Sequence, residues 1–260
     1  MRKQIQELTV GEHRPRGRPA PCGWGRVRSS RLVATIVAAV VALGGCALFQ
    51  EDKSYSPVID PAQFVARVDN PFFPLVPGTT MRYLETTDEG TRDVVSTVMP
   101  DVKVIAGVSV TVVHEVSSAA GEVHEDTWDW YAQDRAGNVW YFGEDTTEYE
   151  RGKASKEGSW ETGVKGAKPG IVMPAHPVVG RMDRQEYAVG EAEDQGQVIG
   201  VNETVRVGDT QYTGCVKTKE WSRLEPAVVE HKYYAPGIGF VSEVTIEGGA
   251  EHVELVGIEK

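Results

Sequence analysis

Two histidines and a carboxylate on neighbouring predicted strands are the side chains best suited to bind a metal. His114, His124 and Asp126 flank residues 117–121, which we expect to form a five-residue hairpin loop. In that register His114 faces His124, and directly opposite residues have Cβ atoms about 5 Å apart. Two imidazoles and a carboxylate could then hold zinc or copper with an open position for water. The alternative is a solvated sheet face, because a one-residue change of register separates the histidines.

Sequence signatures of the common enzyme classes are missing from the chain. It contains no G-x-S-x-G elbow, no H-E-x-x-H motif and no glycine-rich phosphate loop. Acidic residues are so numerous that a close pair of carboxylates would not by itself indicate a glycosidase. We therefore expect a protein that is not an enzyme, with no catalytic residues and no cofactor. A metal-dependent hydrolase built on His114, His124 and Asp126 is the alternative.

Aromatic side chains are dense between residues 128 and 160. Trp128, Trp130, Tyr141 and Trp160 could form a platform for a sugar or an apolar ligand. Asp126 and Asp129 could accept hydrogen bonds from ligand hydroxyls. The alternative is that these rings fill the core between the sheet and a loop, as large aromatic side chains usually do. Alternation along a strand favours the core in part, since it places Trp128 and Trp130 on one face and Asp129 on the other.

A cysteine follows an apolar run and two glycines in VALGGC, residues 41–46. Three arginines precede residues 32–45, a stretch of fourteen residues without a charge. A basic start, a short apolar run and small residues at the cleavage position are typical of a secretory signal peptide. The run is too short for a transmembrane helix, which needs about 20 residues. A buried helix that ends in Gly-Gly-Cys is the alternative.

Residues 43–46, LGGC, resemble the bacterial lipobox. The resemblance implies that the Cys46 thiol carries a diacylglycerol and that signal peptidase II cuts between Gly45 and Cys46. We therefore expect residues 1–45 to be a signal peptide and palmitate-type acyl chains to anchor the protein on the outer side of a cell membrane. Residues 1–26 are an over-extended gene start if translation begins at Val27, which N-terminal sequencing of the precursor would test.

Processing would change the charge and the cysteine content. Removal of residues 1–45 takes away eight Lys and Arg and two acidic residues, and leaves a formal charge of −17. Such a surface repels nucleic acid and anionic lipid headgroups, so membrane contact would come from the acyl chains. With Cys22 removed and Cys46 acylated, Cys215 is left alone, and we expect it to be buried without a disulfide.

The elements that must position these residues are strands. From residue 81 onwards β-branched residues alternate, turn signals separate the runs, and long helical periodicity is absent. Before them, residues 46–57 form a polar tether, and Asp60-Pro61 is typical of a helix start. We expect one short helix there, with Phe64, Val65 and Val68 as its apolar side.

The segment DNPFFPLVPG, residues 69–78, contains three prolines. Proline removes a backbone donor and fixes φ, so we expect no regular element in this segment. Phe72, Phe73 and Leu75 should instead pack as a plug against the domain.

An internal repeat is visible in three places. GTTMR at residues 78–82 recurs as GRMDR at 180–184, an offset of 102, and Tyr131 corresponds to Tyr234 at an offset of 103. A third match lies between these two in each half of the chain: the stretch VIAGVSVTVVHEV, which starts at Val104, is echoed by VRVGDTQYTGCVKT, which starts at Val205. We infer a β domain, residues 58–260, made of two repeats, 78–156 and 180–258, joined by a Gly/Pro-rich loop at 157–179. One meander cannot hide its apolar face alone, so the two should curl into a half-barrel or a wide curved sheet. Two small domains are the alternative.

Two stretches carry a family resemblance. DNPFFPLVPGTT, with a β-rich body and the late YYAPGIGFV hairpin, resembles uncharacterised secreted bacterial lipoproteins. The hairpin is also similar to half-barrel envelope proteins of the lipoprotein-localisation-factor type. The first resemblance implies no known activity, and function can be carried over from the second only by analogy. We expect a membrane-anchored binding or carrier module, in which the curved apolar face of the sheet receives a lipid or another apolar ligand. The alternative is a structural or assembly subunit that binds another envelope protein along a sheet edge.

Overall fold

The computed structural model describes residues 54–150 and 152–260. These residues form a large antiparallel sheet, a two-stranded sheet and one 3-10 helix, η1 (Pro61–Gln63), so the all-β prediction is confirmed. The predicted signal peptide, its cleavage position, Cys46 and most of the tether lie outside the described residues. Within the described ranges, no helix is long and apolar enough to cross a membrane.

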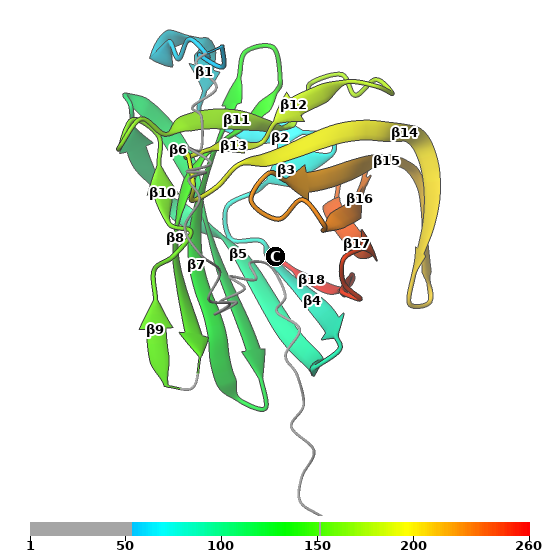
Figure 1. The fold of residues 1–260 in the computed structure, drawn as a ribbon. Helices are drawn as coiled ribbons and strands as arrows, with labels where there is room; N and C mark the ends of the chain where they lie inside the picture. The colour runs from blue at the N-terminus through cyan, green and yellow to red at the C-terminus, as the bar shows by residue number, and fades with distance from the viewer. Residues whose placement is uncertain (1–53, 151) are drawn as a thin grey trace, which may run out of the picture.

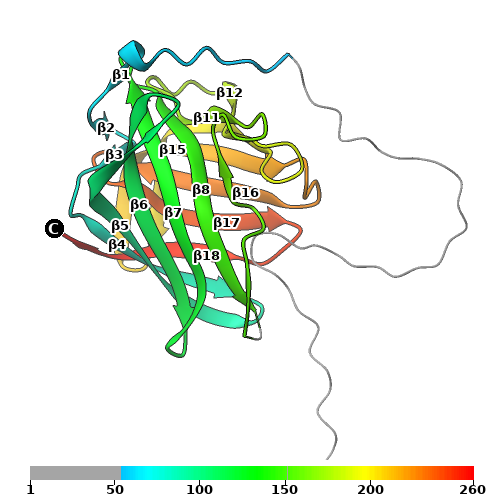
Figure 2. The ribbon, with the colours of Figure 1, turned by 90° about the vertical axis from the view of Figure 1, so that its left-hand side faces the viewer.

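Two walls of long strands make up the large sheet (Figure 1). The N-terminal wall consists of β4 (Thr80–Thr87), β5 (Gly90–Ile105), β6 (Val108–Ala119), β7 (Glu122–Asp134) and β8 (Val139–Glu150). The C-terminal wall consists of β14 (Asp194–Val207), β15 (Thr210–Ser222), β16 (Val229–Ala235), β17 (Gly239–Glu247) and β18 (His252–Glu259). Because β18 pairs with β4, the two walls are one continuous sheet. Figure 2 looks onto the N-terminal wall, with the strands of the C-terminal wall behind it.

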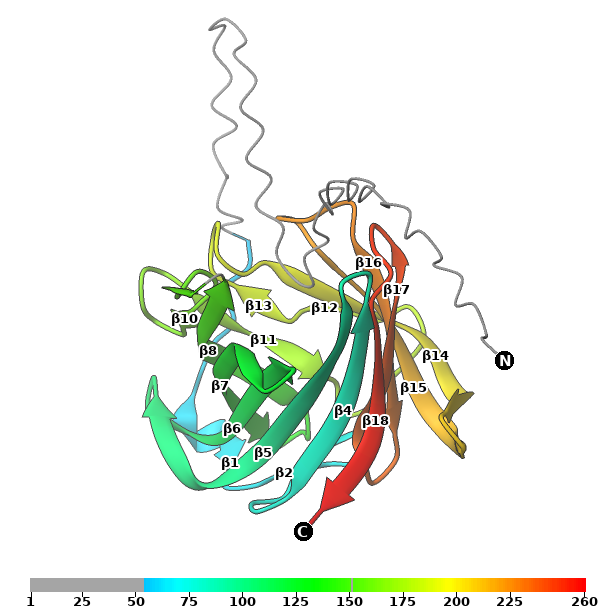
Figure 3. The same ribbon diagram turned by 90° about the horizontal axis from the view of Figure 1, so that it is seen from below.

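Short strands join the far edges of the two walls. They are β9 (Lys153–Ser155), β10 (Trp160–Glu161), β11 (Lys168–Met173), β12 (Met182–Arg184) and β13 (Glu186–Tyr187). The strand β11 pairs with β8 and with β13, whereas β12 pairs with β14. The predicted half-barrel is therefore a nearly closed, barrel-like sheet, and Figure 3 shows it curling round from β8 through β5 and β4 to β14.

The segment 157–179 was expected to be a loop, but it contains β10 and β11. The sequence KPGIVM at β11 is apolar enough to be buried on the sheet, and β8 offers it an unpaired edge. The joining segment is therefore part of the barrel.

The start of the domain is only partly as predicted. Asp60 caps η1, since its Oδ1 accepts a hydrogen bond from the Ala62 backbone N–H at 3.0 Å. The predicted apolar side of a helix is wrong, because Phe64 and Val65 form β1 (Phe64–Val65) on the edge of β7. The Phe64 ring packs against Phe142 with ring centroids 5.5 Å apart, and this tertiary contact outweighs the local helix preference.

A small hairpin closes one end of the barrel. It consists of β2 (Val68–Asn70) and β3 (Phe73–Leu75), so the prediction of no regular element here is wrong, while the predicted plug is confirmed. Asn70 Nδ2 donates to the Gly137 carbonyl at 2.9 Å, and the Gly237 backbone N–H donates to the Pro71 carbonyl at 2.7 Å. The hairpin is thereby bonded to a turn in each wall.

The two walls share details of backbone geometry. The Gly78 N–H donates to the Val98 carbonyl at 2.8 Å, and the Gly180 N–H donates to the Val198 carbonyl at the same distance. Both walls also have a bulge before an inward tyrosine, Tyr131 in β7 and Tyr234 in β16. These matches agree with an internal duplication, although the boundaries of the repeats stay a prediction.

The turn between β6 and β7 is shorter than expected. Ala120 and Gly121 have φ values of 52° and 84°, and Ala119 pairs with Glu122 across a two-residue turn. Left-handed conformations at both positions match the twist of a hairpin, and glycine at the second makes them accessible. The predicted five-residue loop and its register are therefore wrong.

Candidate functional site

A cavity of about 380 Å³ lies inside the barrel, between the two walls. Side chains from β3 to β8, from β11 and β13, and from β14 to β18 line it. Since successive residues of a strand point to opposite faces, every second residue of these strands faces the cavity. The volume is within the range of about 300–1,000 Å³ that is usual for small-molecule sites.

One end of the cavity is apolar. The β2–β3 hairpin contributes Phe73 and Leu75 there, and the walls contribute Met81, Val98, Ile238 and Phe240. These positions lie near the strand ends that the hairpin covers. Removing this apolar surface from water is favourable, so an apolar group of matching shape would be stabilised here.

The other end of the cavity is strongly charged. Carboxylates dominate there, among them Glu85, Glu115, Glu125, Asp129, Glu220, Glu243 and Glu251. Of the described residues that line the cavity, Arg92 and Lys232 alone are basic. Glu85 and Glu125 lie near the turns β4–β5 and β6–β7, at the opposite end of the strands from the plug. The cavity is thus amphipathic along its length.

A lysine surrounded by glutamates forms the polar group of the C-terminal wall. Lys232 Nζ lies 3.2 Å from Glu220 Oε2, 3.2 Å from Glu243 Oε2 and 3.8 Å from Glu230 Oε2. Burial alone would lower the pKa of Lys232, but the three carboxylates outweigh burial and raise this pKa well above its usual value. The ammonium is therefore charged and neutralised within the protein.

Carboxyl groups without such a lysine form the polar group of the N-terminal wall. The Tyr141 hydroxyl donates to Asp129 Oδ1 at 2.5 Å, and burial, together with nearby Glu115, raises the pKa of Asp129 well above its usual range. Burial and the charge of Glu125 also raise the pKa of Glu115 to about 7. In the described part of the chain, no cationic side chain lies within 4.0 Å of these three carboxyl groups.

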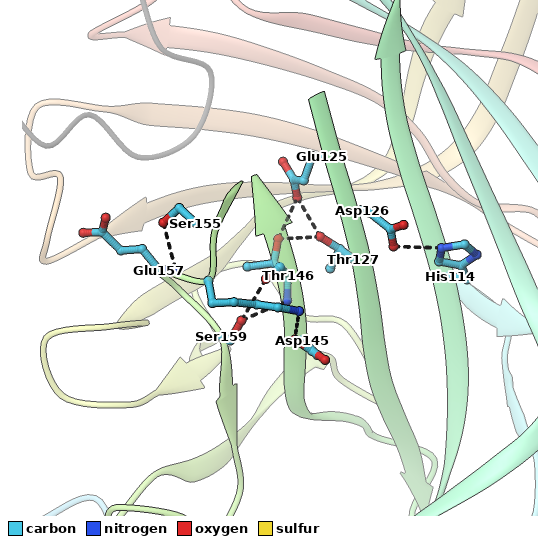
Figure 4. Close-up of polar contacts among 10 residues, drawn as sticks. His114, Glu125, Asp126, Thr127, Asp145, Thr146, Ser155, Glu157 and Ser159 are labelled. Carbon is cyan, nitrogen blue, oxygen red and sulfur yellow. Dashed lines mark hydrogen bonds and ion pairs between the residues drawn. The ribbon is translucent and has the colours of Figure 1, made fainter. Parts of the chain in front are cut away.

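Hydroxyl groups support Glu125 at the rim of the cavity. Thr127 Oγ1 donates to Glu125 Oε1 at 2.9 Å, and Thr127 and Thr146 share a hydrogen bond of 2.6 Å (Figure 4). The Ser159 hydroxyl donates to the Thr146 carbonyl at 3.1 Å, which ties the segment before β10 to β8. The Glu125 carboxylate is therefore held in place by hydroxyl groups of β7 and β8.

The predicted metal residues are only partly brought together. His114 Nε2 lies 3.0 Å from Asp126 Oδ1, but His114 pairs across the sheet with Trp128, and their rings stack at 4.0 Å. His124 lies at a bulge in β7, with no residue directly opposite. The prediction that His114 faces His124 is wrong, because the two-residue turn shifts the register. Among residues 54–150 and 152–260, no three His, Cys, Asp or Glu side chains are grouped to hold a metal ion.

The predicted aromatic platform is divided between two faces of the sheet. Tyr141 lines the cavity, with Trp160 packed edge-on against it at 5.5 Å between ring centroids. Trp130 is buried in the core on the outer side of the sheet under Lys103, and Trp128 is exposed on the same outer side. The four rings therefore do not form one binding surface.

Sequence reasoning missed most of the polar lining, including Glu115, Glu220 and Lys232. A signal was present, since the inward positions Val113, Glu115 and Ser117 alternate with outward ones. Inward glutamates are unexpected next to valines in a buried strand, because burying a charge is costly unless it is paired. Only the register of each strand, however, shows which acidic residues share the cavity.

No protein-family model and no curated protein matches the chain. Among solved structures, it is similar to a protein from Bacteroides fragilis NCTC 9343 that is described as exported, with a YmcC-like fold; the TM-score is 0.45 at 16% identity, over 73% of this chain and 99% of that chain. It is also similar to a protein from Parabacteroides distasonis ATCC 8503 described as a lipoprotein, with a TM-score of 0.42 at 12% identity over the same shares. At these values the likeness concerns the fold alone and carries no activity over.

Proposed function

We propose that the protein is a binding or carrier module that holds one amphipathic small molecule in the barrel cavity. The observation that supports this proposal is a cavity of about 380 Å³ with an apolar end at the plug and a charged end at the opposite turns. Side chains of the described residues leave this space open, and ligand sites are usually concave spaces of about this volume.

The apolar end suits the hydrophobic part of such a ligand. Burial of a chain methylene against Phe73, Leu75 and Phe240 contributes about 0.8 kcal/mol each. Phe73 and Leu75 belong to β3 and Phe240 belongs to β17, so these side chains are already ordered by regular strands. Little conformational entropy should therefore be lost from them when the ligand enters. The polar part would remain near the charged end.

We further propose that the module is exported and held at a membrane by lipid on Cys46. The support is the sequence of residues 26–46, with its arginines, its apolar run and its lipobox-like end. Binding of another envelope protein along a sheet edge is the competing proposal.

Native mass spectrometry of residues 46–260 carrying Cys46→Ser, produced in its own host behind a signal peptide whose cleavage does not need lipidation, tests this function. We expect one organic molecule retained per chain, with a mass that begins to identify it. A clean mass of the free protein, together with no binding of added decanol, would contradict the proposal and would favour a protein partner.

A matched pair of variants locates the molecule. Ser96 lines the cavity, so Ser96→Trp should fill the space and abolish retention. Val95 is the neighbouring residue on the opposite face of β5, so Val95→Trp should leave retention unchanged. Equal loss in both variants would place the ligand elsewhere.

A further inference from the structure

The cavity of the proposed binding function has an excess of carboxyl groups, and this excess indicates the class of ligand. The inference rests on that proposed function, since it assigns the charge of the molecule that the cavity holds. Acidic residues on a surface are ordinarily solvated, but these line a partly open cavity with an apolar end. The polar residues at matching positions of the two walls indicate which chemical group these carboxylates could bind.

The registers of the two walls define the matching positions. In the N-terminal wall Glu115 pairs with Thr127, and two residues nearer the plug Val113 pairs with Asp129. In the C-terminal wall Glu220 pairs with Glu230, and two residues nearer the plug Thr218 pairs with Lys232. A bulge and an inward tyrosine follow in both walls. Glu115 therefore corresponds to Glu220, and Asp129 corresponds to Lys232.

The C-terminal wall shows what its carboxylates bind. Glu220 and Glu243 each lie 3.2 Å from the ammonium of Lys232. Glu220 is also ordered by hydroxyl donors, Thr218 Oγ1 at 2.7 Å and Tyr234 Oη at 3.2 Å. An ammonium is thus the group that this arrangement of glutamates accommodates, with charge-assisted hydrogen bonds.

The N-terminal wall keeps the glutamate and lacks the ammonium. Glu115 faces the cavity, Asp129 replaces the lysine, and neither has a cationic partner within 4.0 Å among the described residues. The stacked rings of Tyr131 and Tyr141, 4.8 Å apart, border the same space and present aromatic surface that attracts cations. Burial is the main cause that raises the pKa of Glu115 to about 7 and that of Asp129 well above its usual range. Repulsion by Glu125 adds to the shift of Glu115, and repulsion by Glu115 adds to that of Asp129.

We propose that the cavity binds an amphipathic amine, whose ammonium group lies among Glu115, Glu125 and Asp129 and whose apolar part points toward Phe73, Leu75 and Phe240. The ligand's ammonium supplies in the N-terminal wall what Lys232 supplies in the C-terminal wall. A neutral or anionic amphiphile of equal length lacks this interaction and leaves the carboxylates facing a less polar space.

Calorimetric titration at neutral pH with decylamine, decanol and decanoate tests the proposal on the mature chain carrying Cys46→Ser. We expect decylamine to bind about tenfold more tightly than decanol, and decanoate to bind most weakly, as charge complementarity requires. Equal affinities, or tighter binding of decanol or decanoate, would overturn the assignment of an amine and leave the binding function standing. No binding of any of the three would overturn the binding function itself.

Variants separate a specific site from the general negative charge of the protein. Asp129→Asn and Glu115→Gln should each weaken decylamine binding by about fivefold to tenfold and leave decanol unaffected. Asp126→Asn removes a carboxylate from the outer face of the same strand and should change neither affinity. An equal loss in Asp126→Asn would show attraction by net charge only and would overturn the site. The ligand series on the unsubstituted chain decides the proposal if a variant fails to fold.

Discussion

Asp129 in the N-terminal wall and Lys232 in the C-terminal wall occupy corresponding positions, but they carry side chains of opposite sign. Around Lys232 three glutamates complete an ion group within the protein. Around Asp129 the Tyr141 hydroxyl is a hydrogen-bond donor, and the neighbouring charges are also acidic. The same backbone arrangement therefore gives one polar group that is neutralised internally and one that would be neutralised by a bound cation or by protons.

Loss of the lysine gives the largest effect that the comparison predicts. Lys232→Met should lower the free energy of unfolding by about 3–5 kcal/mol, because it leaves buried glutamates without their cation. Denaturation by urea, followed by circular dichroism, measures the change. Adding Glu220→Gln to the same variant should restore part of the loss, since one uncompensated carboxylate is removed.

Lys219→Met is the control, because Lys219 adjoins Glu220 on β15 and points to the outer face. Its effect should be within about 0.5 kcal/mol. If both lysine variants lost equal stability, the ion group would have no special role, and the contrast between the two walls would disappear.

The acidic group of the N-terminal wall should make the stability of the ligand-free protein depend on pH. The pKa of Glu115 is raised from 4.5 to about 7, mainly by burial, so the folded state retains a proton that the unfolded state releases. The free energy of unfolding must therefore fall as the pH rises between these values. We expect the Tm to be several degrees higher at about pH 5.5 than at about pH 8.5.

Glu115→Gln should reduce this pH dependence, and Glu122→Gln, at an exposed position of the β6–β7 turn, should not. Scanning calorimetry at the two pH values measures both. Identical pH profiles for the two variants would attribute the effect to overall net charge and not to the cavity.

The smallest predicted effect concerns the outer faces. In the N-terminal wall His114 stacks on Trp128 and contacts Asp126, whereas at the corresponding place in the C-terminal wall Lys219 lies opposite His231. His114→Ala should change the free energy of unfolding by about 1 kcal/mol or less, because partly exposed ion pairs contribute little. Calorimetric titration with zinc should give the same heat for this variant and for the unsubstituted chain. If zinc bound to the unsubstituted chain and not to the variant, the predicted metal site at His114 would be supported again.

The fold could be predicted further than the site. Alternating β-branched residues and regular turn signals indicated an all-β protein, and three echoes of sequence indicated two similar units. The predicted metal site was wrong because of the turn at Ala120-Gly121. The structure has a two-residue turn there, whereas the sequence is also compatible with a longer loop. Because side chains alternate at every residue, such a local choice decides which ones meet across the sheet.

Local pattern and turn chemistry are enough to predict the strand-rich architecture, the plug of Phe72, Phe73 and Leu75, and the cap at Asp60. The sequence also contains the lipobox-like segment on which the anchoring proposal depends. The tertiary structure alone decided that Glu115, Asp129 and Lys232 face one cavity. Their positions depend on strand register and on closure of the sheet, which join residues more than a hundred positions apart. Alternation within one strand therefore could not show which charged residues share the cavity.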